Sequence, residues 1–395
     1  MALVGLQHDD PMTTPHRFDL TLAVVTHVAH WAREDGLWAY EPYVREMSVW
    51  ADLFRTVEVC APVGEGPISG NQAPYSARNV NWKPVHYSSS NGAAGRMHRL
   101  RQLPTLARVL RSLIKRSDLV LLRSPGHPAL VGRAIADALR TPHITKWAGF
   151  FGPFPGERLP RRLERYLAAR SRKPVLVYGP AEAPHLVTFL PALMTEDELE
   201  RARNLSLRRT WDEPWRVLSV GRLSAEKGFD LAIQGLARLR QCCPELPWVY
   251  KLIGDGLEAP ALRNLAKRSG IDDRVTFTGA LSFRAVQEHY ATAHVVVMPG
   301  ACEGWPKPIA EAWAHGAVPL AAVGGIIPWI MKGKPSGLTF APTPDGLAEA
   351  LRALICDPAL MQRMSDQGPL LVRELSLESF RARLERVLVD SCRLS

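Results

Sequence analysis

The sequence lacks several features that would place it in a class at once. Its 395 residues contain six cysteines, none of them in a C-x-x-C pair, so neither a zinc-binding pattern nor a disulfide framework is indicated. No apolar run approaches the ~18 residues that a membrane-spanning helix needs. The first 17 residues do not show the charged and then apolar order of a signal peptide. We therefore expect reduced cysteines and a cytoplasmic location.

Positive charge is abundant but confined to the first part of the chain. The sequence has 49 Lys and Arg against 39 Asp and Glu, a net charge of +10. Up to residue 173 there are 24 basic and 14 acidic residues, whereas the 25 basic and 25 acidic residues that follow cancel. This asymmetry indicates an anionic partner, which could be nucleic acid, a phosphorylated substrate or a membrane surface. No nucleic-acid recognition motif accompanies the charge, which argues against the first of these.

Short apolar runs alternate with helical patterns along the chain. This alternation is typical of doubly wound α/β domains with parallel sheets, and the length allows for two or three domains. Strands are predicted at residues 20–25, 56–60, 118–122, 143–147, 175–178, 186–189, 215–220 and 295–299, and helices at 41–53, 103–116, 196–203 and 377–389. The segments 27–40 and 62–80 are predicted to be loops.

The stretch around residue 305 carries the most specific chemistry. The strand at 295–299 leads into a loop with Glu303, and a helix with Glu311 in its first turn follows. Pro308 suits the first turn of that helix and Gly316 its end. The start of a helix offers unpaired N–H groups and partial positive charge, which suit a diphosphate. Carboxylates on either side of such a cradle can accept hydrogen bonds from sugar hydroxyls.

Four motifs follow one another in the second half of the chain. They are Val220 to Asp230, Leu252 to Gly256, Arg274 to Gly279, and Glu303 to Ala312. The last one resembles the E-x7-E signature of family 4 retaining glycosyltransferases, and the order of all four is similar to that of this family. The resemblance implies the GT-B fold, an α/β architecture in which two Rossmann-like doubly wound domains face a central cleft.

The resemblance also implies a division of the chain. An N-terminal acceptor-side domain would cover residues 1–203, a linker 204–214, and a C-terminal nucleotide-sugar-binding domain 215–376. The last segment, 377–395, would be a helix that crosses back to the N-terminal domain.

Site residues are implied in the same way. Glu303 would hold hydroxyls of the donor sugar and form the catalytic set with Arg222 and Lys227, which match the diphosphate-binding pair of the family. Glu311 would hold the nucleotide ribose. The other donor-binding residues would be Gly221, Thr278, Gly279, Ala280, Gly304, Trp305 and Lys307. Because the chain contains no D-x-D motif, we expect no metal ion on the diphosphate and no cofactor; the basic pair would take over the role of the metal.

The acceptor side departs from the family pattern. The Gly-Gly turn that family members usually have after the first strand is absent here. The aromatic loop 27–40, with His27, His30 and Trp31, is therefore either an acceptor loop or a packed surface loop. Family members often place a His at the end of the strand predicted at 118–122. Here Arg123 is closest to that place, as a contact for phosphate or a sugar hydroxyl, and His127, four residues later, is either a site residue or a loop residue without a role.

These features lead to an expected function. The chain is predicted to move a hexose-type sugar, with retention of configuration, from a UDP- or GDP-linked donor to a lipid-linked or polysaccharide-precursor acceptor. The helix at 103–116 has a basic face with Arg108, Arg111 and Lys115, which either faces solvent or meets anionic lipid at the inner face of a membrane. The alternatives are a soluble transferase acting on a small metabolite or sugar phosphate, and a catalytically degenerate protein that binds nucleotide and serves as a partner.

Overall fold

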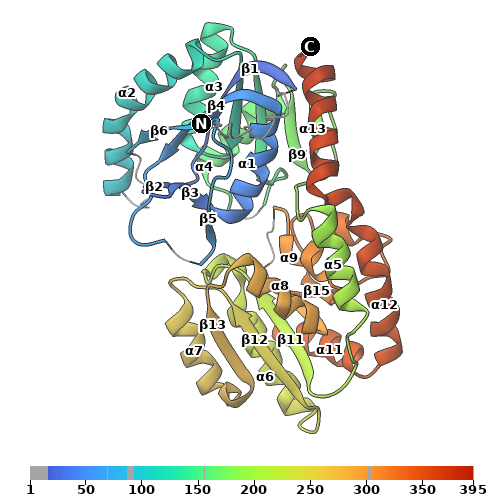
Figure 1. Ribbon diagram of the computed structural model, residues 1–395. Coiled ribbons are helices and arrows are strands. Elements are labelled where there is room, and N and C mark those ends of the chain that lie inside the picture. The colour runs from blue at the N-terminus through green and yellow to red at the C-terminus, as the bar shows by residue number, and fades with distance from the viewer. Residues whose placement is uncertain (1–16, 69, 87–92, 155, 301–303, 395) are drawn as a thin grey trace, which may run out of the picture.

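The computed structural model describes residues 17–68, 70–86, 93–154, 156–300 and 304–394. Within them the strands form two parallel sheets and one small antiparallel sheet. Figure 1 shows the two parallel sheets in separate halves of the molecule. We call the upper half, which contains β1 to β10, the first domain, and the lower half, which contains β11 to β16, the second domain.

The first sheet has the strand order β6-β4-β1-β7-β8-β9-β10 and the second has the order β13-β12-β11-β14-β15-β16. The first consists of β1 (Phe18–Val25), β4 (Phe54–Pro62), β6 (Val80–Val85), β7 (Leu119–Ser124), β8 (His143–Phe150), β9 (Val175–Tyr178) and β10 (Leu186–Thr188). The second consists of β11 (Trp215–Val220), β12 (Trp248–Ile253), β13 (Val275–Gly279), β14 (Val295–Met298), β15 (Val318–Ala322) and β16 (Leu338–Phe340). The order reverses between β1 and β7 and again between β11 and β14. In open parallel sheets, ligands bind beyond the carboxyl ends of the strands at such a reversal.

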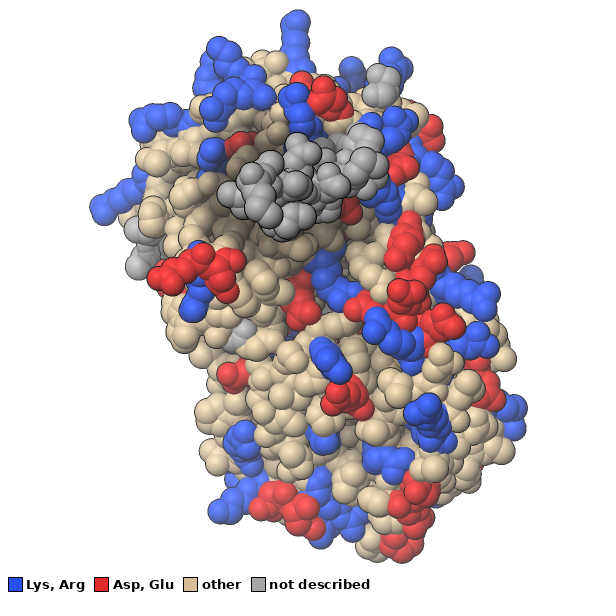
Figure 2. All heavy atoms as spheres, in the orientation of Figure 1, with Lys and Arg blue, Asp and Glu red and all other residues tan. Residues whose placement is uncertain are grey.

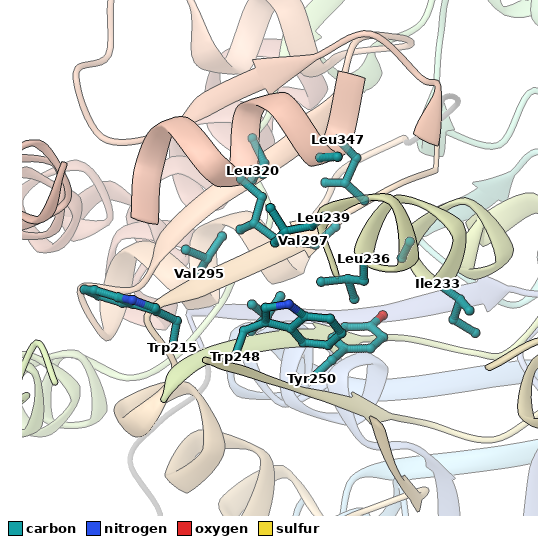
Figure 3. Packing of buried hydrophobic residues seen from close by; sticks show 14 of the residues in the cluster. Trp215, Ile233, Leu236, Leu239, Trp248, Tyr250, Val295, Val297, Leu320 and Leu347 are labelled. Carbon is teal, nitrogen blue, oxygen red and sulfur yellow. The ribbon is translucent and has the colours of Figure 1, made fainter. Parts of the chain in front are cut away.

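Helices cover both faces of the sheets, as the buried apolar strands require. They are α1 (Glu41–Leu53), α2 (Ala93–Lys115), α3 (His127–Leu139), α4 (Leu159–Ala169), α5 (Glu196–Ser206), α6 (Phe229–Cys242), α7 (Ala259–Arg268), α8 (Phe283–Thr292), α9 (Lys307–Ala314), α10 (Ile327–Met331), α11 (Pro344–Ile355), α12 (Pro358–Leu371) and α13 (Leu377–Cys392). Figure 3 shows the core of the second domain, where Trp248 and Tyr250 of β12 pack below Leu236 of α6 and Leu347 of α11.

The last helix belongs to the core of the first domain. Phe380, Leu384 and Leu388 of α13 are fully buried among residues of α1 and the first sheet. Figure 1 shows α13 running along the first domain after α12 has ended on the second. On the opposite face of the first sheet, α2 and α3 form a separate apolar cluster with β1 and β7. No helix in the described part of the chain is long and apolar enough to cross a membrane.

The predicted loop 27–40 is a β-hairpin. Strands β2 (His30–Arg33) and β3 (Gly36–Tyr40) pair with Trp31 opposite Trp38, and β5 (Gln72–Pro74), within the predicted loop 62–80, adds a third strand. Gly36 has a φ of 129°, a backbone conformation that favours glycine at this turn. The prediction of a loop at 27–40 was therefore wrong, and the prediction of a loop at 62–80 missed one short strand in a segment that is otherwise irregular between β4 and β6. Strand β5 escaped prediction because its pairing partner, β3, lies some 30 residues earlier in the chain.

Helix α2 is longer than the predicted helix 103–116. It begins at Ala93, so Pro104 lies inside it and not near its start. Arg108, Arg111 and Lys115 are exposed, as predicted, while Leu106 and Leu110 are buried against the sheet. In the first domain the sequence analysis also missed β6, α3 and α4, and in the second domain it gave bounds only for the strands at 215–220 and 295–299 and for α9.

A single arginine in the segment after α5 joins the ends of two helices. The guanidinium of Arg209 donates hydrogen bonds to the carbonyls of Tyr290 and Ala291 at the end of α8, both at 3.0 Å. It also donates to the carbonyl of His315 at 2.7 Å, and to that of Gly316, at the end of α9. Helix ends leave such carbonyls without an intrahelical donor and carry partial negative charge. Burial, with a smaller contribution from Arg216, lowers the pKa of Arg209 to about 9, so it remains a cation at neutral pH.

We expect Arg209→Met to lower the free energy of unfolding by about 3 kcal/mol, because a hydrogen bond to a charged group contributes roughly 1.5–3 kcal/mol and several carbonyls lose their donor. Arg208 is exposed, so Arg208→Met is the matched control and should change stability by less than about 0.5 kcal/mol. Chemical denaturation measures both. Equal effects of the two substitutions would contradict this role of Arg209.

Candidate active cleft

The carboxyl ends of the two parallel sheets meet. After β14, Gly304 lies so close to the end of β8 that a Cβ placed on it would be 2.4 Å from the Cα of Gly149. The ring of Trp305 lies beside that of Tyr178, the last residue of β9, with ring centroids 5.9 Å apart. The ends of both sheets therefore border one cleft, and Figure 2 shows acidic and basic side chains gathered at the notch between the domains.

The turn after β11 carries two cations of the predicted donor site. Arg222 is exposed and Lys227 half-buried, at the two ends of a turn that includes a short 3-10 helix (Ala225–Lys227). Burial alone would raise the pKa of Glu226, but the Ser224 hydroxyl and the charges of Arg222 and Lys227 hold it below its ordinary value. The acid between the two cations is thus ionised and offsets part of their charge.

Two glycines set the shape of this turn. Gly254, with a φ of 142°, packs so closely that a Cβ there would lie 1.8 Å from the carbonyl oxygen of Gly221. Gly228, with a φ of 65°, lies against Pro299, whose carbonyl oxygen would be 3.0 Å from a Cβ. The glycines of two different sequence motifs therefore hold the turn against the ends of β12 and β14.

The start of α9 faces the same place. A small hollow is lined by Val220, Lys227, Phe229, Met298, Pro299 and Pro308, so the basic turn and the first turn of α9 lie on its two sides. The helix begins at Lys307 and Gly316 has a φ of 61°, close to the predicted bounds. Glu311 is the fifth residue of the helix and does not lie in its first turn, where it was predicted, because the helix begins before Pro308. The structure thus brings the basic turn and the mouth of the helix together.

Two charged side chains of α9 reach into the cleft. Burial raises the pKa of Glu311, an effect that the Tyr290 hydroxyl and the charges of Lys307 and Arg45 partly offset. Burial lowers the pKa of Lys307, against the opposing pull of Glu46 and Glu311. Because Glu46 belongs to α1, charges of the two domains act on each other across the cleft.

The part of the predicted donor site that would hold the nucleobase lies at the end of β13. Thr278 donates its hydroxyl to the carbonyl oxygen of Gly279 at 2.9 Å, and that oxygen also accepts the N–H of Gly254 at 2.9 Å. Gly70 of the first domain approaches Ala280; a Cβ on Gly70 would lie 3.4 Å from its carbonyl oxygen. Thr278, Gly279 and Ala280 therefore border the cleft from the far edge of the second sheet. Glu303 lies outside the described residues.

The first domain supplies a buried ionic cluster that the sequence analysis found only in part. Arg123, at the end of β7, donates from Nη1 to Oε1 of Glu46 at 3.3 Å, and its guanidinium lies 4.9 Å from the ring centroid of Tyr43. Lys146 of β8 places Nζ 2.5 Å from Oε2 of Glu46. Burial alone would raise the pKa of Glu46, but Lys146 and Arg123 hold it below its ordinary value. Burial lowers the pKa of Lys146 to about 8.

One signal in the sequence could have found this cluster. Lys146 is a charged residue within an otherwise apolar strand pattern, and buried charges are paired. Its partner Glu46 lies 100 residues earlier in the chain, on a helix, and nothing local in the sequence indicates the pairing.

The histidines and Trp31 of the predicted acceptor side separate into different environments. His27, two residues after β1, is exposed and lies beside Gly126 at the start of α3, but desolvation by its surroundings and the charge of Arg123 lower its pKa to about 4. His30 is buried inside the hairpin, with Nδ1 2.8 Å from the carbonyl oxygen of Val28 and Nε2 2.9 Å from the Tyr75 hydroxyl. Of these two histidines, only His27 is therefore accessible to a ligand.

Trp31 and His127 serve local structure. The Trp31 ring lies flat against Gly64, where a Cβ would come within 2.0 Å of it. His127 is the first residue of α3 and is not in a loop. The Glu164 carboxylate of α4 accepts a hydrogen bond from the N–H of Gly126 at the start of α3, at 2.8 Å. This N–H is therefore not available to a ligand.

Comparisons with known proteins agree with this geometry. A sequence model of the family described as "Glycosyl transferases group 1" matches residues 208–370. The chain is 30% identical to an alpha-D-kanosaminyltransferase of Streptomyces kanamyceticus over 260 residues, and this aligned region covers 64% of each chain. It is 27% identical over 292 residues to an uncharacterized glycosyltransferase of Haemophilus influenzae, which covers 69% of this chain and 77% of that one.

Residues 208–370 thus match the group 1 glycosyltransferases, and the two relatives are named as glycosyltransferases as well. The predicted family is confirmed. A third relative of the chain is a lipopolysaccharide core biosynthesis glycosyltransferase, LpsE, of Rhizobium meliloti, with 31% identity over 154 residues, 38% of this chain and 43% of that one. The matched regions thus span 43% to 77% of the length of these three relatives.

Solved structures resemble the chain over nearly its whole length. Sucrose-phosphate synthase from Thermosynechococcus elongatus has a TM-score of 0.69 at 17% identity and covers 93% of this chain and 98% of its own. Anabaena HepE in complex with UDP-glucose has a TM-score of 0.67 at 16% identity, with 93% and 99% covered. These likenesses confirm the predicted GT-B fold of two Rossmann-like domains.

The close approach of the domains at Gly304 leads to a prediction. Gly304→Ala puts a methyl group against the backbone of Gly149, which has no flexible side chain to yield, so the domains must move apart. We expect at least a tenfold loss of any activity that needs both sides of the cleft, because misplacing reacting groups by about 1 Å costs on the order of 100-fold.

Gly70→Ala is the matched control, because it adds the same methyl group at another glycine between the domains, where the contact of 3.4 Å is an ordinary one. It should keep nearly full activity. Assaying both variants beside their thermal midpoints separates cleft geometry from folding. Equal activities of the two variants would contradict the importance of this contact.

Proposed function

We propose that this chain is a retaining glycosyltransferase that moves a hexose-type sugar from a nucleoside diphosphate to a lipid-linked or polysaccharide-precursor acceptor, without a metal ion. The observation that supports it best is the hollow with Lys227 on one side and the start of α9 on the other. A diphosphate at the mouth of this hollow would meet Lys227 and the start of a helix, with Arg222 at the other end of the same turn.

The charges suit the bond that must break. When the bond between the anomeric carbon and the phosphate oxygen breaks, its electron pair goes to the diphosphate. Arg222, Lys227 and the partial positive charge at the start of α9 would stabilise that charge, which is the role that metal ions serve in other transferases. Glu311 would accept hydrogen bonds from the ribose hydroxyls, and Glu303 from hydroxyls of the sugar.

The acceptor would attack on the face that the diphosphate leaves. Its hydroxyl oxygen forms the new bond to the anomeric carbon while its proton passes to the departing phosphate oxygen, so configuration is retained and no protein nucleophile is required. His27 is neutral at neutral pH because its pKa is lowered to about 4. It can therefore accept a hydrogen bond from an acceptor hydroxyl at the end of β1.

Two comparisons favour particular substrates. The HepE structure was determined with UDP-glucose, which favours a UDP-linked donor over a GDP-linked one. The name of the LpsE relative refers to the lipopolysaccharide core, which favours a glycan on a lipid as the acceptor.

A surface of the first domain favours an anionic membrane as partner. The outer side of α4 carries Leu159, Leu163 and Tyr166, which are 77%, 52% and 51% exposed, with Arg162 and Arg170 exposed beside them. Apolar side chains flanked by cations suit the interface of an anionic bilayer. Helix α4 packs against Trp147 of β8. By the strand register, Trp147 points to the same side of the sheet as Leu122, which belongs to the apolar cluster under α2 and α3. Helices α4 and α2 therefore cover the same face of the sheet. The exposed Arg108, Arg111 and Lys115 of α2 lie on the same side of the domain, and Figure 2 shows Lys and Arg around the upper domain.

The donor site is tested by charge removal. Isothermal titration with UDP, GDP, ADP and TDP identifies the nucleobase that the site prefers. The double variant Arg222→Ala with Lys227→Ala should bind the preferred nucleoside diphosphate roughly 100-fold more weakly, since two charge-assisted hydrogen bonds are lost. Lys267→Ala with Arg268→Ala removes the same charge from the exposed end of α7 and should leave the affinity unchanged. Turnover of the matching nucleotide sugars should fall in parallel with the affinity.

Two results would count against this proposal. Unchanged nucleotide affinity in the Arg222 and Lys227 variant would remove the donor site from this place. Tight binding without any turnover would favour the degenerate, nucleotide-binding partner protein.

The membrane surface is tested by flotation with vesicles of phosphatidylglycerol and phosphatidylcholine. We expect binding at low salt that weakens as salt is raised, because each basic residue near such a surface contributes ~1 kcal/mol and is screened. Leu163→Asp with Tyr166→Asp should abolish flotation, whereas Leu257→Asp, at a residue 97% exposed in the second domain, should not. No flotation of the unaltered chain at low salt would favour the transferase that acts on a small metabolite or sugar phosphate.

A further inference from the structure

The small sheet of the first domain forms a wall of the cleft against the second domain. Gly70, just before β5, approaches the backbone of Ala280 and Leu281. One turn into α1, the guanidinium of Arg45 lies 4.4 Å from the ring centroid of Phe283, the first residue of α8. The strands β2, β3 and β5 therefore reach the predicted base end of the donor site from the opposite domain.

Tyr40 lies at the end of this wall, and its backbone is fixed on both sides. It is the last residue of β3, paired with Gln72 of β5. The next residue, Glu41, begins α1 and donates its N–H to the carbonyl of Asn71 at 2.9 Å. The side chain is nevertheless 45% exposed. The backbone of Tyr40 is thus held rigidly while its aromatic side chain is left partly uncovered. Such a side chain is preorganised to contact a ligand.

The charges that act on the Tyr40 phenol come from the donor site. They are those of Glu311 on α9, Arg222 in the basic turn and Arg123 of the first domain, with Glu41 beside it. Desolvation, and after it the Glu311 carboxylate, raises the pKa of Tyr40. The hydroxyl is therefore protonated at neutral pH and can donate a hydrogen bond. The two groups that would hold ribose and diphosphate both lie within electrostatic reach of it.

We propose that Tyr40 is a donor-binding residue supplied by the first domain, whose hydroxyl donates a hydrogen bond to a diphosphate oxygen held by Arg222. The inference rests on the proposed function. It gives the donor a contact on the first domain. Donor binding then depends on both domains.

The test compares a nucleoside diphosphate with its nucleoside. Isothermal titration with UDP and uridine, or the pair for whichever base is selected, is carried out on the full chain and on Tyr40→Phe. We expect roughly tenfold weaker binding of the diphosphate, since a hydrogen bond to a charged group is lost, and unchanged binding of the nucleoside. Trp38→Phe is the matched control. It removes one hydrogen-bonding group from the same strand, the indole N–H that donates to Asp35 at 2.9 Å, and it should change neither affinity.

Further combinations separate the inference from the proposed function. In a double-substitution cycle, Tyr40→Phe with Arg222→Ala should cost less than the sum of the two single effects, because both groups bind the same phosphate. If Tyr40→Phe binds UDP like the unaltered chain while Arg222→Ala does not, the inference alone is overturned. If the unaltered chain binds no nucleoside diphosphate, the proposed function fails and the inference falls with it.

Discussion

The close backbone approach between Gly304 and Gly149 is the constraint on which the arrangement of the cleft depends. Parallel sheets place their loops at the carboxyl ends of their strands, so two such sheets share a site only if these ends face each other. Here they meet where neither residue has a side chain, and a single methyl group on Gly304 would lie 2.4 Å from the Cα of Gly149. The glycine of the motif after β14 therefore serves the contact between the domains.

Charge then makes the cleft specific. Lys307 and Glu311 of the second domain interact with Glu46, Arg45 and Arg123 of the first. Arg45 also forms an ion pair with Glu198 of α5. Because these side chains are desolvated, their interactions are stronger than those of surface ion pairs and are costly to leave unpaired. The cleft thus has a fixed electrostatic lining before any ligand arrives, which is the condition for electrostatic stabilisation of a leaving diphosphate.

Local patterns in the sequence predicted the elements that carry the site. The helix at 41–53 and the strand at 215–220 have their predicted bounds. The helix predicted to begin at residue 196 does begin there, behind a capping box formed by Thr195 and Glu198. Pairings between distant segments could not be read in this way. The β2–β3–β5 sheet depends on two strands more than 30 residues apart, and the ion pair of Glu46 with Lys146 depends on the alignment of α1 with β8. His30 and Trp31 suggested an acceptor loop because aromatic and polar residues occur in both binding loops and packed hairpins.

The most direct test of the account is a crystal structure of the chain with the nucleoside diphosphate that it binds. The account predicts the diphosphate in the hollow between the basic turn and the start of α9, with its oxygens within hydrogen-bond distance of Arg222 and Lys227 and its ribose hydroxyls on Glu311. A diphosphate bound elsewhere, or bound with Arg222 and Lys227 both turned away from it, would contradict the account.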